Sequence, residues 1–132
     1  MAKQFRLLIV DDDAAIRDVT SQVFAEVGYK VETAVDGEDA LRVVEGFQPD
    51  LIISDLRMPG MSGYEFLEIV RERFPQLPVI AISGEFPGDS LPEGVIADAF
   101  LSKGKYAISR LRNTAAELLA VAPMRASRNL QS

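Results

Sequence analysis

The chain has 132 residues, with 20 acidic and 14 basic side chains for a formal net charge of −6, and it contains neither histidine nor cysteine. This length indicates one domain, and 48% hydrophobic residues suffice for an ordinary globular core. The composition excludes disulfides, thiolate or imidazole metal sites, and Ser-His-Asp or Cys-His nucleophiles. Any chemistry must therefore use carboxylates, hydroxyls, lysine, arginine and the backbone.

The first apolar run, FRLLIV, breaks directly into three aspartates. It is too short for a signal-peptide core or a membrane span, so we expect a cytoplasmic protein that does not bind membranes. Negative net charge argues against direct nucleic-acid binding. The excess of basic residues after residue 102 is interpreted as a solvated helix face rather than a site for an acidic partner.

Short apolar runs of strand length alternate with helical periodicity along the chain. The predicted strands are residues 5–10, 30–34, 51–54, 79–83 and 99–102. Apolar residues at helical spacing lie between and after them: Ile16, Val19, Val23, Phe24 and Val27; Ala40, Leu41 and Val44; Phe66, Leu67, Val70 and Phe74; Ile108, Leu111, Leu118 and Leu119. Nearly continuous Leu, Ile and Val favour strands buried on both faces, so the pattern predicts a doubly wound α/β fold with a parallel sheet.

Two segments depart from this alternation. Residues 83–97, SGEFPGDSLPEGVIA, contain two prolines and several glycines where a fourth crossover helix is expected, so that helix is predicted to be short or missing. Residues 122–132 lack periodicity and are predicted as a flexible C-terminal tail after a domain that comprises residues 1–121.

Unusual polar residues follow several of the predicted strands. Asp11, Asp12 and Asp13 follow the first strand and Asp55 follows the third, and ligands of open parallel sheets bind at these carboxyl ends. If the first and third strands are neighbours, carboxylates converge, and a hard divalent cation such as Mg²⁺ would relieve their repulsion. Helix capping is the simpler explanation for Asp13, but it explains little for Asp55.

The segments LIVDDD, ISDLRMPGMSG, IAISG and FLSKG, in this order and spacing, resemble the receiver domain of two-component response regulators. The resemblance covers about residues 5–121. It implies a flavodoxin-like five-stranded sheet in the order 2-1-3-4-5, with helices on both faces.

The resemblance also implies a role for individual positions. Asp55 would accept a phosphoryl group from a phosphohistidine, and Asp11, Asp12, Asp55 and the backbone carbonyl of Arg57 would hold Mg²⁺. Lys103 would pair with a phosphoryl oxygen, Ser83 would donate its hydroxyl to another, and Phe100 would then rotate inward as a switch.

Three features depart from the family pattern. Gly104 follows Lys103 where the family usually has a proline, so we expect a trans peptide bond there. The altered segment 85–96 puts the usual output surface in doubt, and signalling would proceed by ordering that segment. Arg57 and Glu85 are placed to pair across the entrance to the site and slow hydrolysis of the acyl phosphate.

The resemblance therefore predicts a phosphoacceptor signalling domain that catalyses only its own phosphorylation and dephosphorylation. We expect a stand-alone, monomeric or weakly dimeric receiver whose partners are a sensor histidine kinase or histidine phosphotransfer protein and a downstream protein. The alternative is a degenerate receiver that acts as a phosphorylation-independent adaptor. An aspartyl-nucleophile phosphatase would need a second carboxylate where Arg57 stands, and dinucleotide or flavin binding lacks its glycine-rich turn.

Overall fold

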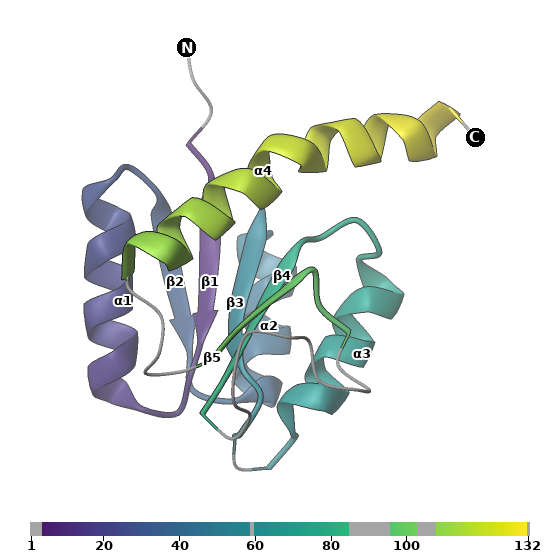
Figure 1. The fold of residues 1–132 in the computed structure, drawn as a ribbon. Coiled ribbons are helices and arrows are strands. Elements are labelled where there is room, and N and C mark those ends of the chain that lie inside the picture. Colours follow the sequence, from purple (N-terminus) through teal and green to yellow (C-terminus); the bar gives the residue numbers. More distant parts are fainter. Residues whose placement is uncertain (1–3, 59, 85–95, 103–107, 132) are drawn as a thin grey trace.

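The computed structural model describes residues 4–58, 60–84, 96–102 and 108–131, with side chains through residue 121 (Figure 1). Five parallel strands form one sheet in the order β2-β1-β3-β4-β5, which confirms the predicted fold class. Their bounds are β1 Arg6–Val10, β2 Lys30–Ala34, β3 Leu51–Asp55, β4 Val79–Ser83 and β5 Ala99–Ser102. Every residue of β3 and β4 is buried, as their unbroken runs of Leu, Ile and Val predict.

Helices cover both faces of the sheet. The helices α1 (Ala14–Glu26) and α4 (Ile108–Gln131) pack on one face, and α2 (Gly37–Phe47) and α3 (Gly63–Arg73) pack on the other (Figure 1). A hydrophobic core lies on each face of the sheet. Alternate residues of a strand belong to different cores, because successive side chains of a strand point to opposite faces. Among the residues described, no helix is both long and apolar enough to cross a membrane.

The buried face of α1 differs from the predicted apolar stripe. Thr20 and Phe24 are buried, whereas Val19 is 60% exposed and Val27, at the C-cap, is 50% exposed. Residues 20 and 24 lie one above the other on a helix, and residue 19 is rotated by about 100° from residue 20. A hydroxyl-bearing threonine therefore occupies the core face, and the apolar pattern alone identified the wrong face for Val19.

The last helix is longer than predicted. It continues through Gln131, so residues 122–131, which the sequence analysis assigned to a tail, are helical. This stretch has no stripe of large apolar residues at helical spacing and contains Pro123, so neither periodicity nor propensity predicts the extension. The flexibility of this segment stays a prediction, and residues 85–95, where the missing helix was predicted, lie outside the described residues.

Two aspartates close the amino-terminal edge of the sheet by the same pair of bonds. Asp50 precedes β3; its Oδ2 accepts from the backbone N–H of Arg6 at 2.8 Å, and its own N–H donates to the Arg6 carbonyl at 2.7 Å. Asp98 precedes β5 and makes the equivalent two bonds with Val79, at 2.8 and 2.9 Å. Each carboxylate thus satisfies the first N–H of a neighbouring strand.

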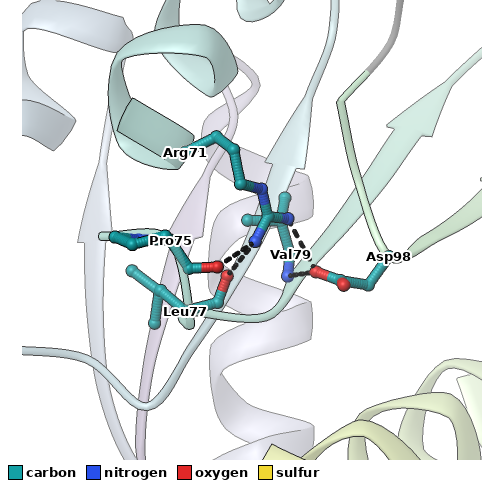
Figure 2. A network of polar contacts seen from close by, with 5 residues as sticks. All are labelled: Arg71, Pro75, Leu77, Val79 and Asp98. Carbon is teal, nitrogen blue, oxygen red and sulfur yellow. Dashed lines mark hydrogen bonds and ion pairs between the residues drawn. The ribbon is translucent and has the colours of Figure 1, made fainter. Parts of the chain in front are cut away.

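An arginine from α3 extends the second of these pairs. Arg71 donates through Nη2 to Asp98 Oδ2 at 2.9 Å and through Nη1 to the carbonyls of Pro75 and Leu77 at 3.0 and 3.3 Å (Figure 2). The side chains of Arg71 and Asp98 are only 24% and 19% exposed, so this ion pair is largely shielded from water. It joins the end of α3 to the starts of β4 and β5.

Candidate functional site

Three carboxylates meet at the carboxyl edge of the sheet. Asp11 directly follows β1 and Asp55 ends β3, and these strands are neighbours, with Val10 opposite Ser54. Carboxylate oxygens of Asp11, Asp12 and Asp55 all lie within 4.8 Å of one another. The side chains of Asp11 and Asp55 are buried, whereas Asp12 is exposed. The acids after the first and third strands therefore converge as predicted. The cluster reaches solvent through the exposed side chain of Asp12.

Contacts to the backbone hold Asp11 in place. Its N–H donates to the carbonyl of Ala34, at the end of β2, at 3.2 Å. Its Oδ1 accepts from the N–H of Asp13 at 2.9 Å, and its carbonyl accepts from Nη1 of Arg17 at 2.7 Å. The loop between β1 and α1 is thus fixed at three points around the first acid of the cluster.

Asp13 has a different task from its two neighbours. It is the N-cap of α1, and its Oδ1 accepts from the N–H groups of Ala15 and Ile16 at 2.9 and 3.3 Å. This arrangement satisfies two backbone donors that a helix start otherwise leaves without partners, which confirms the capping interpretation of Asp13.

The loop after Asp55 is held by the start of α3. The N–H of Arg57 donates to Asp55 Oδ1 at 3.1 Å, and the N–H of Leu56 donates to the Ile82 carbonyl in β4 at 2.9 Å. Gly63, the first residue of α3, donates to the Leu56 carbonyl at 3.1 Å. A Cβ at Gly63 would lie 2.5 Å from the Leu56 Cα and 2.7 Å from the Asp55 carbonyl oxygen.

Two residues of this site were missed by the sequence analysis. Gly63 lies within the quoted segment ISDLRMPGMSG, and a glycine at a helix start after a buried strand could have indicated close backbone approach. Arg17 offered no such signal, because its partner is a main-chain carbonyl and a sequence cannot show which carbonyl a long side chain reaches.

The donor set of the cluster fits a hard divalent cation. Such ions take oxygen ligands, and the carboxylates of the cluster, whose oxygens lie within 4.8 Å of one another, supply them. The bond from the Arg57 N–H to Asp55 fixes the backbone next to Asp55. Asp11 and Asp55 are buried like charges, which nearby positive charge stabilises.

Two other predicted site residues, Ser83 and Phe100, lie on β4 and β5. Ile82 is opposite Asp55 in the sheet, so Ser83 lies one residue beyond the acid, and Ser83 is opposite Ser102. Both serines are buried. Phe100 is also buried and belongs to the core on the α2 and α3 side, so its ring already lies inside the fold. Lys103, Gly104 and Glu85 lie outside the described residues, as do the predictions made for them.

A separate apolar pocket lies at the opposite edge of the sheet. Its volume is about 420 Å³, and it lies between the end of α2 and the turn that follows α3. Its lining residues are Val44, Gln48, Pro49, Phe74, Pro75, Gln76 and Leu77. None of the described residues that line this pocket has a titratable side chain, so these residues offer none of the groups that the acidic cluster provides.

Known proteins show the same sequence pattern and fold. The family model of the response regulator receiver domain matches residues 7–116. The chain is 42% identical over 78 residues to the Regulator of RpoS of Escherichia coli K12, a match that covers 59% of this chain and 23% of that protein. It is 35% identical over 92 residues to the DNA-binding transcriptional regulator NtrC of the same organism, covering 70% of this chain and 20% of that protein. The matched segment thus spans less than a quarter of either relative.

Solved structures agree over nearly their whole length. The chemotaxis response regulator CheY4 of Vibrio cholerae superposes with a TM-score of 0.77 at 32% identity, covering 88% of this chain and 99% of that one. A CheY-like receiver domain protein of Methanospirillum hungatei gives a TM-score of 0.84 at 29% identity, covering 93% and 99%. With the family match over residues 7–116 and the acids at the ends of β1 and β3, this chain belongs to the response regulator receiver domain family.

Proposed function

We propose that this chain accepts a phosphoryl group on Asp55 from a phosphohistidine of a sensor histidine kinase or a histidine phosphotransfer protein. The observation that carries the proposal is the buried Asp55 carboxylate at the end of β3, within 4.8 Å of the carboxylates of Asp11 and Asp12. Family membership supports signalling as the role of the domain. The 132 residues contain no histidine, so the phosphohistidine that donates the phosphoryl group would lie outside them.

In the proposed reaction, an Asp55 carboxylate oxygen forms a bond to phosphorus while the P–N bond of the phosphohistidine breaks. The electron pair of that bond leaves with the imidazole nitrogen, and the product is an acyl phosphate. The Arg57 N–H at 3.1 Å from Oδ1 orients the carboxylate for this attack. The chain would thus catalyse only its own modification, and water would reverse it by hydrolysis.

Asp11, Asp12, Asp55 and the Arg57 carbonyl are the groups that we propose as ligands of Mg²⁺. When bound, the ion would neutralise the charge that develops on the phosphoryl oxygens. Asp11 and Asp12 would hold it against Asp55. The position of Asp11 is supported by the N–H that it donates to Ala34 and by the bonds that it accepts from Asp13 and Arg17.

We assign recognition of the acyl phosphate to Ser83, the last residue of β4, and to Lys103, which follows β5 in the sequence. Ser83 would donate its hydroxyl to one phosphoryl oxygen and Lys103 would pair with another as a compact positive charge. We propose that this pull changes the surface formed around β4 and β5, with Phe100 as the switch residue, and that a downstream protein binds the changed surface. Since Phe100 is buried in this structure, its movement would be a repacking within the core rather than entry from solvent.

The direct test is phosphorylation of matched aspartate variants with acetyl phosphate and Mg²⁺, followed by intact-mass spectrometry. Wild type and Asp13→Asn should take up one phosphoryl group, because asparagine also caps a helix and Asp13 is outside the cluster. Asp55→Asn should take up none, and EDTA should prevent uptake by the wild type. Undiminished labelling of Asp55→Asn would refute the proposal, and a folded wild type that takes no label would favour the adaptor alternative.

A further inference from the structure

Arg17 connects helix α1 to the acidic cluster without entering it. It lies in the first turns of α1, is half-buried, and donates through Nη1 to the main-chain carbonyl of Asp11 at 2.7 Å. This distance is at the short end for a charge-assisted hydrogen bond. The backbone of Arg17 is also fixed, because its N–H donates to the carbonyl of the N-cap Asp13 at 3.0 Å.

The carbonyl that Arg17 holds belongs to the peptide unit between Asp11 and Asp12. Fixing that unit fixes the direction in which both side chains leave the backbone, since a planar peptide leaves only two soft dihedral angles per residue. On the other side of Asp11, the N–H bonded to Ala34 prevents rotation of the preceding peptide. Arg17 and Ala34 therefore hold the first acid from both sides.

We propose that Arg17 is a positioning residue that orients the Asp11 and Asp12 carboxylates toward Asp55 for cation binding. The inference rests on the cation site of the proposed function and assigns Arg17 no contact with the cation or the phosphoryl group. Hydrogen-bond partners of metal ligands commonly change metal affinity by about 10- to 100-fold when they are removed.

The sign of the effect separates positioning from simple electrostatics. A guanidinium beside a cation site repels the cation, so removal of its charge alone should tighten binding. Loss of the bond to the Asp11 carbonyl should instead weaken binding, because the two carboxylates would have to be ordered by the cation itself. Positioning and charge thus predict opposite changes for the same substitution.

The experiment measures Mg²⁺ affinity by isothermal titration calorimetry and Mn²⁺ affinity by electron paramagnetic resonance, without any phosphodonor. Arg17→Met should weaken both affinities by about 10-fold or more. Arg17→Lys should recover part of the loss, because an ammonium can donate to the same carbonyl. Arg73→Met is the matched control: it removes an arginine whose exposed partner is Glu45, away from the acids, and should leave the affinities unchanged.

Affinity of Arg17→Met that equals or exceeds the wild-type value would overturn the inference. Thermal unfolding of each variant shows whether it is folded at the titration temperature, and Arg17→Leu, which also lacks a donor, replaces Arg17→Met if the latter does not fold. If the wild type binds neither cation, the cation site fails and the inference fails with it. If the wild type binds and Arg17→Met binds equally well, the inference alone fails, and the labelling of Asp55 stands as a separate result.

Discussion

Replacing Gly63 with alanine should push the first turn of α3 against the backbone of Asp55 and Leu56, next to the proposed phosphoacceptor. The new Cβ would lie 2.5 Å from the Leu56 Cα, about 0.9 Å inside the ordinary contact distance of 3.4 Å, and 2.7 and 2.8 Å from the carbonyl oxygens of Asp55 and Leu56. All three atoms are backbone, so no side chain can rotate away. Either the helix or the loop must move.

The expected cost is about 1–3 kcal/mol for overpacking a tight contact. Loss of the 3.1 Å bond from the Gly63 N–H to the Leu56 carbonyl would add about 1 kcal/mol. The higher helix propensity of alanine offsets up to about 1 kcal/mol of this total. We therefore expect a net loss of roughly 1–3 kcal/mol in the free energy of unfolding, with slower phosphorylation of Asp55.

Gly46 in α2 provides the matched control, since a Cβ there would meet no atom within 4 Å. Gly46→Ala should stabilise the protein by about 0.5–1 kcal/mol, because alanine loses less backbone entropy in a helix. Urea unfolding followed by circular dichroism measures both variants, and acetyl phosphate labelling measures uptake. If Gly63→Ala is as stable as Gly46→Ala and is labelled at the wild-type rate, the reasoning about this contact is wrong.

Two further predictions concern Asp98, at the amino-terminal edge of the sheet, and Tyr29. Asp98→Ala should lower the free energy of unfolding by about 2–3 kcal/mol, because it leaves the Val79 N–H and the Arg71 guanidinium without their shared acceptor. Asp98→Asn should lower it by less, since an amide oxygen can still accept from Val79. Equal losses for the two variants in urea titrations would contradict this assignment. Burial raises the pKa of Tyr29 above its usual value of 10.0, so its stabilising effect is full below pH 10 and is lost as the pH rises through the higher folded-state pKa. The ultraviolet difference titration curves of the wild type and Tyr29→Phe should differ by one phenol that ionises above pH 10, and curves that differ by a phenol ionising at or below pH 10 would contradict the effect of burial.

The strands were predictable because burial on both faces leaves a direct trace in the sequence. Residues 79–82 read as an unbroken apolar run, and β4, which adds Ser83, has no exposed residue. The acidic cluster was predictable for a topological reason, since carboxyl ends of neighbouring parallel strands share one edge. The capping role of Asp13 followed from its place before a helix.

The parts that failed depend on contacts a sequence does not encode locally. Val19 fits an apolar stripe but faces solvent, because the direction in which α1 packs is decided by Phe24 against the sheet. The extension of α4 to Gln131 has no stripe of large apolar residues at helical spacing, so periodicity could not predict it. Arg17 and Gly63 act on main-chain atoms, whose positions appear only after the chain has folded.

The two hydrogen bonds between Asp50 and Arg6 fix the register of β3 relative to its neighbour β1. Asp55 is the fifth residue after Asp50, and a strand advances about 3.3 Å per residue. A slip of one residue would turn Asp55 to the other face of the sheet, and a slip of two would carry it about 6.6 Å, farther than the 4.8 Å that spans the three carboxylates. The position of the Asp55 carboxylate is therefore set partly at the other end of β3. A substitution there should impair the proposed phosphorylation without touching any group that would take part in it.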